Sequence, residues 1–351
     1  MMKRVFDKDF CLSSYIALRY IWKDGYDFFP GFAHRNFKPL SSSCLISVKS
    51  ALQIGEVIQM QIDSLYDKFD TVGILLSGGM DSAILASYLR PGSHAYTFVS
   101  STGIFDLDLQ RARSYCDQFG LIHHLVEISF EDYKKFTPIV MAHKWAPVHS
   151  IEPQIYKAAL QAKKDGVDVL VIGDGADYVF GGMDKLLSKD WTFDAFVRRY
   201  NALDPESVLS NPVQMTEVYE PFRLGEDGID FIGFLQGPCT IESYSSYENA
   251  LETAQMPFLD PYIVFSMAEP LDLERIRKGE PKYFIRELFA LRYPALDIPE
   301  KIPMPRPVDA IFSDWGGPSR LEFRKDINMN ALTGNQKWQL WCAELFLDYF
   351  D

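Results

Sequence analysis

The sequence is poor in cysteine, in long apolar runs and in blocks of basic residues, and each shortage argues against a class of protein. Its 351 residues hold five widely separated cysteines and no C-x-x-C pair, which argues against a disulfide framework and against a cysteine-ligated zinc site. No stretch reaches the ~18 to 20 continuous apolar residues of a membrane span, and the N-terminus lacks the apolar core of a signal peptide. We therefore expect a cytoplasmic protein without a membrane partner.

The charge balance is acidic, with 35 lysines and arginines against 48 aspartates and glutamates, and a formal net charge of −13 at pH 7. Such a field repels phosphate backbones, so nucleic acid is not an expected partner. The composition is otherwise that of a globular protein, with 47% hydrophobic and 24% charged residues. The length indicates one large domain, or two that share an interface.

Short apolar segments alternate with helical patterns in the middle of the chain. This alternation is typical of a doubly wound parallel α/β sheet. We expect strands at 71–76, 94–99, 123–128 and 168–173, separated by helices at 81–89, 106–119, 131–142 and 154–164.

Three parts are expected along the chain. Residues 1–65 form a helical and aromatic segment that packs on the core, residues 66–190 form the α/β core, and residues 191–351 form a mostly helical substrate or lid portion. The closing aromatic helix, 336–350, is expected to dock on its own domain or on a partner, which leaves a homo-oligomer open. The run at 50–69 predicts a helix whose apolar face holds Leu52, Ile58, Ile62 and Leu65.

The stretch SGGMDS, residues 77–82, lies between the first expected strand and its helix. Glycines there let backbone N–H groups approach an anion, the helix N-terminus adds unpaired N–H groups, and Ser77 and Ser82 add hydroxyl donors. Asp81 would repel a phosphate unless a hard cation such as Mg²⁺ lay between them. The pattern therefore favours a metal-assisted polyphosphate site. The simpler interpretation is a glycine-rich turn in which Asp81 caps the helix.

A second glycine-acid motif, LVIGDGADYVFGGM at 170–183, follows the fourth expected strand. Ligands in open α/β sheets bind beyond the carboxyl ends of the strands, so this loop can face the first one. Asp81 and Asp177 could then hold Mg²⁺ jointly. Either motif alone is weak, whereas the two together, in this order, are a specific signal.

The two motifs together resemble a known family. SGGMDS is similar to the PP-loop of the N-type ATP pyrophosphatases, and GDGADYVFGG resembles the second signature of the asparagine synthetase C-terminal (synthetase) domain. The resemblance extends over roughly residues 70–345. Further matching segments are FGLIHHLVEI at 119–128, MPFLDPYIVFSMAEPL at 256–271 (the family's Pro-Phe-Leu-Asp helix), PKYFIRELF at 281–289 (its Lys-x-x-x-Arg segment) and IPEKI at 298–302.

The resemblance implies an ATP- and Mg²⁺-dependent amide-forming synthetase. Such enzymes join a carboxylate to the α-phosphorus of ATP and release pyrophosphate, after which ammonia or another amine displaces AMP. By the same resemblance Asp177 would be the second metal ligand beside Asp81. The PP-loop residues Ser77, Gly78, Gly79, Asp81 and Ser82 would hold pyrophosphate and metal, while Leu75, Phe98, Val99 and Gly173 would contact adenosine through the main chain.

Departures from the family pattern affect the expected catalytic residues. Asp174 stands where asparagine synthetases carry Glu, and Tyr178 where a second Glu is usual. The family's late-loop lysine has no clear counterpart, so Arg306 and, after it, Lys301 are the candidates for stabilising developing negative charge. Arg306 could equally be a solvated loop residue. These changes suggest a carboxylate substrate other than aspartate.

The nitrogen donor is expected to come from elsewhere. Position 2 is Met, where a glutaminase domain would place its nucleophilic Cys, so ammonia or an amine would arrive free or from a separate glutaminase chain. Two alternatives stay open, a nucleotide-binding pseudoenzyme or regulatory subunit, and another PP-loop adenylase such as a tRNA-thiolating enzyme. Four further residues have mainly structural interpretations: Cys11 in packing, His123 and His124 in a strand, and His149, which could instead line the substrate cleft with Glu152.

Overall fold

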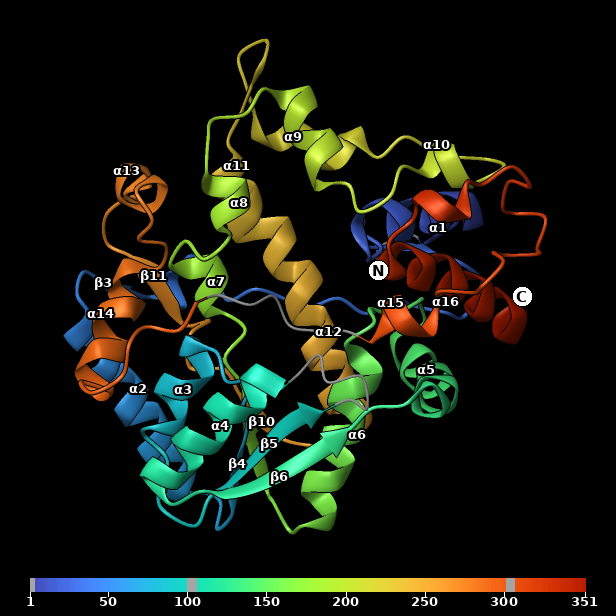
Figure 1. Cartoon of the computed structure of the whole chain (residues 1–351). Helices are drawn as coiled ribbons and strands as arrows, with labels where there is room; N and C mark the ends of the chain where they lie inside the picture. The colour runs from blue at the N-terminus through green and yellow to red at the C-terminus, as the bar shows by residue number, and fades with distance from the viewer. Residues whose placement is uncertain (1–3, 100–105, 301–306) are drawn as a thin grey trace.

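The computed structural model describes residues 4–99, 106–300 and 307–351 (Figure 1). Its centre is a five-stranded sheet in the order β10-β7-β4-β5-β6, in which every pair is parallel. The predicted doubly wound parallel α/β class is confirmed. The strands are β4 (Val72–Leu75), β5 (His94–Val99), β6 (Ile122–Glu127), β7 (Val169–Val171) and β10 (Phe258–Leu259).

The fifth strand, β10, corrects the expectation of a helix at Pro-Phe-Leu-Asp. Phe258 and Leu259 pair with Leu170 and Val171 of β7, and the segment beyond them turns and pairs again as β11 (Phe265–Met267). A two-residue strand leaves no alternating pattern to detect, because it is specified by the neighbouring strand.

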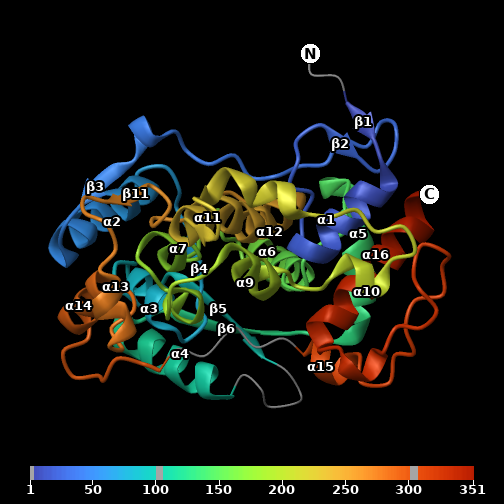
Figure 2. The ribbon, with the colours of Figure 1, turned by 90° about the horizontal axis from the view of Figure 1, so that it is seen from above.

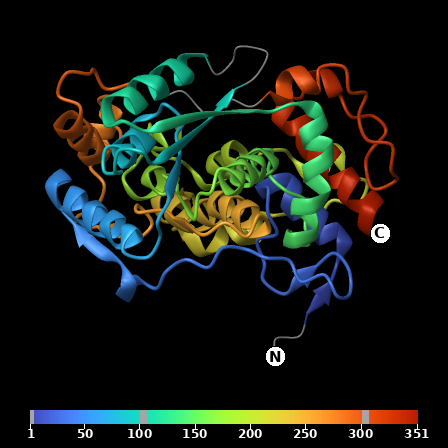
Figure 3. The same ribbon diagram turned by 90° about the horizontal axis from the view of Figure 1, so that it is seen from below.

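Both faces of the sheet are buried. Val169 and Val171 pack into one hydrophobic cluster, whereas Leu170 and Ile172 pack into the other, as expected for alternate residues of a strand covered on both sides. Figures 1 and 3 show α4 and α6 on opposite faces. The helices of this region are α2 (Ala51–Tyr66), α3 (Met80–Ala86), α4 (Asp106–Phe119), α5 (Phe130–Lys144), α6 (Glu152–Lys164), α7 (Ala176–Val179) and α8 (Asp184–Leu187).

The buried face of α2 is displaced from the predicted one. Ile58, Ile62 and Leu65 are buried as expected. Leu52, however, is 65% exposed, and Ile54 takes its place in the core. Spacings of four, four and three from Ile54 follow one helical stripe, whereas Leu52 lies two residues away and faces solvent.

The remainder of the chain is mostly helical, as predicted. Small strand pairs interrupt it, β3 (Ile46–Val48) with β11 and β8 (Arg223–Leu224) with β9 (Gly228–Ile229). Its helices are α9 (Phe193–Tyr200), α10 (Pro205–Val208), α11 (Phe231–Phe234), α12 (Thr240–Thr253), α13 (Leu273–Arg277), α14 (Tyr283–Arg292), α15 (Val308–Ile311) and α16 (Gly334–Phe350).

The first and last helices lie side by side (Figure 2). The first element of the described residues is β1 (Val5–Phe6), which pairs with β2 (Tyr26–Asp27), and the buried helix α1 (Lys8–Leu18) lies between them in the sequence. In α16, Trp338 and Phe346 are fully buried, so the closing helix docks on its own chain. Among the described residues, no helix combines the length and apolarity needed to cross a bilayer. The boundaries near residues 65 and 190 stay predictions.

Candidate active site

The strand order explains why the two glycine-acid loops meet. β5 and β6 lie on one side of β4, and β7 and β10 lie on the other, so the winding direction reverses between β4 and β7. SGGMDS follows β4 and GDGAD follows β7, so both loops leave the carboxyl edge at this switch point. That is the place where open α/β sheets bind their ligands.

The PP-loop has the close backbone packing that its glycines predict. Gly78 has φ +77°, and a Cβ there would lie 2.4 Å from the carbonyl oxygen of Asp108, so only glycine fits. The Ser77 N–H donates to Ser82 Oγ (3.2 Å), and the two hydroxyl oxygens lie 3.1 Å apart. Gly79 is the N-cap of α3. The loop therefore presents hydroxyl groups, backbone N–H groups and the start of a helix at one point.

Asp81 and Asp177, the two predicted metal ligands, converge on one ammonium group. Lys282 Nζ lies 2.5 Å from Asp81 Oδ2 and 2.8 Å from Asp177 Oδ1. The lysine side chain is 7% exposed, and the two carboxylates are 21% and 27% exposed. Asp81, Asp177 and Lys282 thus form one charged centre. We call the two aspartates the carboxylate pair.

Sequence reasoning did not select Lys282 as a site residue, although the Lys-x-x-x-Arg segment contains it. Lys282 is the N-cap of α14 and has φ +53°, a left-handed conformation that costs a non-glycine residue roughly 1–2 kcal/mol. Burial lowers the pKa of Lys282, but attraction to Asp177 and Asp81 outweighs it, so the pKa lies above its ordinary value. Strain combined with a buried charge is typical of a functional position.

Gly182 makes this close approach possible. A Cβ on Gly182 would lie 2.0 Å from Asp177 Oδ1 and 2.8 Å from Lys282 Cδ. The glycine pair at the end of GDGADYVFGG therefore leaves room for the carboxylate and for the lysine stem. The role of this glycine could not be predicted without knowing that Lys282 passes over it.

A small hollow of ≈ 100 Å³, which we call the strand-end hollow, opens at the carboxyl ends of β4, β5 and β7. Three predicted adenosine-contact residues, Leu75, Phe98 and Gly173, line it, together with Ser77, Asp81 and Ser82 of the PP-loop. Val99 follows Phe98 at the end of β5, where its carbonyl accepts a hydrogen bond from the Ile128 N–H, and its nucleotide contact stays a prediction.

A much larger cleft of ≈ 1330 Å³ adjoins this hollow, and Ser77, Asp81 and Asp108 line both. Burial raises the pKa of Asp108 to about 6, although Arg111 opposes the shift. Basic and acidic side chains line the cleft in similar numbers, although the net charge of the chain is negative. The basic ones can pair with an anionic ligand. The basic residues that line the cleft are Arg19, Arg111, Arg199, Arg277, Lys282 and Arg286.

Asp174, a predicted catalytic residue, lies on the wall of the cleft. It accepts a hydrogen bond from Ser243 Oγ (2.9 Å), and the buried Tyr178 lines the cleft beside it. Burial and the nearby carboxylates of Asp260 and Asp177 hold the pKa of Asp174 well above its ordinary range. The carboxyl group can therefore carry a proton at a pH where an exposed aspartate does not.

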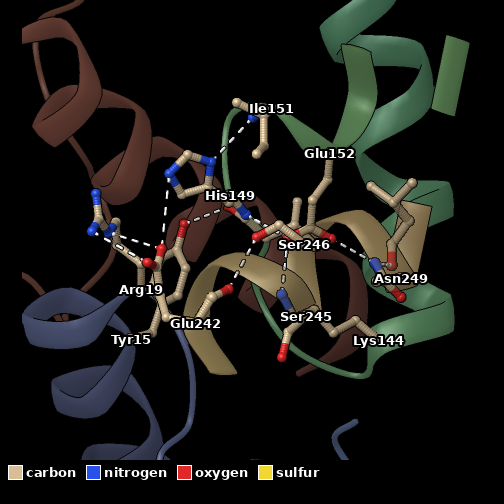
Figure 4. A network of polar contacts seen from close by, with 12 residues as sticks. Tyr15, Arg19, Lys144, His149, Ile151, Glu152, Glu242, Ser245, Ser246 and Asn249 are labelled. Atoms are coloured by element: carbon tan, nitrogen blue, oxygen red, sulfur yellow. Dashed lines mark hydrogen bonds and ion pairs between the residues drawn. The ribbon is translucent and has the colours of Figure 1, made fainter. Parts of the chain in front are cut away.

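The inner wall of the cleft is a polar network built on α1 and α12 (Figure 4). Arg19 Nε lies 3.1 Å from Glu242 Oε1, and His149 Nε2 lies 4.0 Å from the same oxygen. The Ile151 N–H donates to His149 Nδ1 (3.2 Å), so in the neutral ring the proton is on Nε2 and faces Glu242. Arg19, His149 and Glu242 all line the cleft, which confirms that His149 lies at this wall.

Glu152, expected beside His149 in the cleft, is instead fully buried behind the wall. Its Oε1 accepts from Lys144 Nζ and from the His149 N–H, both at 2.8 Å, and its Oε2 accepts from Asn249 Nδ2 at 2.6 Å. Burial raises the pKa of Glu152, although Lys144 and these donors oppose the shift. Glu152 therefore holds the backbone of His149 in place. Sequence alone does not distinguish the two positions, because Glu152, the first residue of α6, stands only three residues after His149.

The remaining predicted residues divide into two groups. Lys301 and Arg306 lie outside the described residues. Of the cysteines, Cys11 is buried in the core as expected, and Cys239 lines the cleft although it is only 2% exposed. Burial raises the pKa of Cys239 to about 12, so its sulfur is a thiol at neutral pH.

Comparison with known sequences agrees with this geometry. The model of the asparagine synthase family matches residues 53–224. Residues 53–224 form an asparagine synthase domain. The chain is 26% identical over 238 residues to the glutamine-hydrolyzing root asparagine synthetase of Pisum sativum, covering 62% of this chain and 35% of that protein. It is 27% identical over 159 residues to a probable glutamine-hydrolyzing asparagine synthetase of Dictyostelium discoideum, covering 39% of this chain and 27% of that protein.

The chain spans about a third of the length of these curated relatives. Among solved structures, the glutamine-dependent NAD⁺ synthetase of Acinetobacter baumannii, in complex with adenosine diphosphate, matches with a TM-score of 0.29 and 12% identity, over 75% of this chain and 48% of that one. A TM-score this low adds nothing to the assignment, which rests on the sequence match. The family is one of ATP-dependent ligases with a PP-loop ATP-binding fold.

Proposed function

We propose that this chain is an ATP- and Mg²⁺-dependent amide-forming synthetase that adenylates a substrate carboxylate. The observation that carries the proposal is the meeting of Asp81, Asp177 and Lys282 where the strand-end hollow adjoins the cleft. A nucleoside in the hollow would direct its phosphates past the PP-loop, and a carboxylate in the cleft could reach the α-phosphorus from the other side.

The residues present fit Mg²⁺. Two carboxylates from separate loops converge on one positive charge, and carboxylate oxygens are the ligands that Mg²⁺ prefers. The bound ion would supply neutralisation of the phosphate oxygens. Lys282 already lies between the carboxylates, and beside a nucleotide its ammonium group would be a second positive charge for the leaving pyrophosphate.

The proposed reaction has two steps. An oxygen of the substrate carboxylate attacks the α-phosphorus, and the bond to the β-phosphate oxygen breaks, so that pyrophosphate leaves. The nitrogen of ammonia or an amine then attacks the acyl carbon, and AMP leaves with one oxygen of the original carboxylate. Ser77, Gly79 and Ser82 would bind pyrophosphate, while Arg306 or Lys301 would stabilise charge that develops during transfer.

Two features of the cleft bear on its substrate. Its arginines and Lys282 can pair with a carboxylate, although acidic side chains line it too, and Glu242 at the inner wall is already paired with Arg19. Asp174 in place of the family's Glu leaves one more carbon's length of space there. We propose a carboxylate other than aspartate, with nitrogen supplied by ammonia, by a separate glutaminase chain or by an amine.

The alternatives receive less support. A thiolating enzyme needs a reactive sulfur, whereas Cys239, which lines the cleft, has a pKa raised to about 12 by burial. The net charge of −13 also opposes binding of RNA. A pseudoenzyme would have no need to keep a strained lysine between two carboxylates.

Product analysis tests the proposal. The purified chain would be incubated with ATP, Mg²⁺, ammonium and a panel of carboxylic acids, each labelled with heavy oxygen, and the products identified by mass spectrometry. Adenylation predicts pyrophosphate, an amide and AMP that carries one labelled oxygen. ADP with labelled phosphate would contradict it, because that pattern requires an acyl-phosphate. ATP binding without turnover of any acid would support the pseudoenzyme.

A further inference from the structure

A second polar cluster lies at the opposite ends of the strands from the PP-loop. His94 begins β5, His124 lies in β6, and Asp165 caps the C-terminus of α6. Because Phe98 at the other end of β5 lines the strand-end hollow, the sheet separates this cluster from the proposed nucleotide site. The cluster is formed by His94, His124 and Asp165, and the mechanism above uses none of them.

The geometry brings three metal-binding atoms together. One nitrogen from each imidazole and one oxygen of Asp165 all lie within 4.8 Å of one another. His94 Nδ1 lies 2.9 Å from His124 Nε2, whereas the other nitrogen of His124, Nδ1, lies 3.4 Å from Asp165 Oδ2, so only one of these two nitrogens would bind the ion. Ligand atoms around tetrahedral Zn²⁺ are roughly 3.3 Å apart for bonds of about 2.0–2.1 Å. The rings of His94 and His124 are stacked, with 7° between their planes, so binding an ion would require at least one ring to turn.

Neighbouring residues hold the cluster in place. Register pairs Tyr96 with His124 across β5 and β6, and Tyr96 and His94 share one face of β5 because they lie two residues apart. The buried Tyr96 donates its hydroxyl to Asp165 Oδ2 at 3.0 Å, and Gln161 Nε2 donates to Asp165 Oδ1 at 3.0 Å. Ligand carboxylates in metal sites are oriented by hydrogen bonds of this kind.

We propose that His94, His124 and Asp165 bind a divalent transition-metal ion, with Zn²⁺ the best fit. Two imidazole nitrogens select a transition metal over Mg²⁺, which the all-oxygen carboxylate pair at the PP-loop suits. All three residues are half-buried, so an ion can enter from solvent and a water can complete its coordination. The ion would join β5, β6 and the end of α6, and its role is structural. This site does not depend on the proposed function.

Calorimetric titration with Zn²⁺ tests the site. The protein would be untagged, would carry Cys44→Ser to remove its exposed thiol, and would be kept in millimolar Mg²⁺ so that the Asp81 and Asp177 carboxylates do not compete. We expect one Zn²⁺ per chain and at least a tenfold weaker affinity in His124→Asn. His123→Asn is the matched control, because His123 adjoins His124 but contacts Thr97 Oγ1 (2.9 Å) instead of the cluster.

Two further measurements keep the test decisive. If His124→Asn fails to fold, Asp165→Asn replaces it, and circular dichroism and thermal unfolding establish which variants are folded. Co²⁺ should give the visible absorption of a low-coordinate nitrogen-oxygen site in wild type and not in the cluster variant. Absence of Zn²⁺ binding, or equal loss of affinity in His123→Asn and His124→Asn, would overturn the proposal.

Discussion

Replacement of Lys282 by Met is the sharpest perturbation that the structure offers. Methionine keeps the apolar length of the stem but removes the ammonium group from between Asp81 and Asp177. Breaking a fully buried ion pair costs about 3–5 kcal/mol. Because the two carboxylates are 21% and 27% exposed, water can solvate them in part, and we expect the free energy of unfolding to fall by about 1–3 kcal/mol.

Thermal unfolding measures this loss. With 351 residues the entropy of unfolding is about 0.74 kcal/mol/K, so the Tm should fall by about 1.5–4 °C. Mg²⁺ should restore most of the loss in Lys282→Met, since it would take the place of the ammonium group between the two carboxylates, and should raise the wild-type Tm less. Pyrophosphate release should fall by about 10²–10³-fold, the usual cost of removing one group that stabilises transition-state charge.

The pH dependence of the same difference can be worked out. Because the pKa of Lys282 is raised above its ordinary value of 10.5 in the folded protein, its stabilising effect is present in full below about pH 10.5 and is lost as the pH rises through the folded-state pKa. The part of the difference in free energy of unfolding between wild type and Lys282→Met that comes from the lysine should therefore stay constant near neutral pH. It should disappear only in strong base.

Lys278→Met is the matched control, since Lys278 is an exposed lysine paired with Glu274 one helical turn away. Such a pair contributes about 0.3–0.5 kcal/mol. If the two variants unfold at the same temperature and respond equally to Mg²⁺, the charged centre is not as described and the reasoning is refuted.

Three further substitutions test the rest of the site. Asp81→Asn should abolish Mg²⁺-dependent pyrophosphate release with little loss of fold by circular dichroism, and a wild-type rate would contradict the metal assignment. Gly182→Ala should displace Asp177, lower turnover and reduce the free energy of unfolding by about 1–3 kcal/mol, which lowers the Tm. Gly316→Ala is the control, because its new Cβ would meet open space and should change the free energy of unfolding by less than about 0.5 kcal/mol. Equal effects of the two substitutions would refute the steric argument. Arg306→Ala should lower kcat far more than ATP affinity in steady-state kinetics, and an unchanged kcat would show that Arg306 has no catalytic role.

Much of the fold could be predicted because the apolar residues recur at regular spacing and because glycine and proline mark the ends of several elements. The helix at 106–119 is predicted with its observed bounds, since Gly120 follows it directly and has φ +65° in the structure. Its buried residues Asp108, Ala112 and Tyr115 recur at helical spacing. Strand β10 was missed because two residues carry no period. The face of α2 was placed wrongly at one position, where Leu52 and Ile54 are equally apolar and only tertiary packing decides between them.

The candidate site was predictable where one loop defines it, and less so where distant segments meet. Asp81 and Asp177 each lie in a glycine-rich loop that follows a predicted strand, so the topology of a parallel sheet predicts that they lie close together. Lys282 begins a helix a hundred residues later, and neither charge nor spacing identifies it as their partner. For Glu152 the sequence predicts a site residue where the structure has none. An acidic residue near His149 is chemically plausible in a cleft, but Glu152 is fully buried.

The position of Lys282 also indicates how the charged centre is held together. The lysine caps α14, and α14 packs against α2 and against α3, the helix that carries Asp81 in its first turn. The hydroxyl of Tyr293, at the other end of α14, donates to the carbonyl of Ala83 at 2.6 Å in the same helix α3. Packing of α14 on α3 therefore fixes the distance between the ammonium group and Asp81, and loosening of this contact would separate the charges before the sheet itself unfolds. The left-handed backbone at residue 282 can persist because the ion pair and this packing both oppose its relaxation.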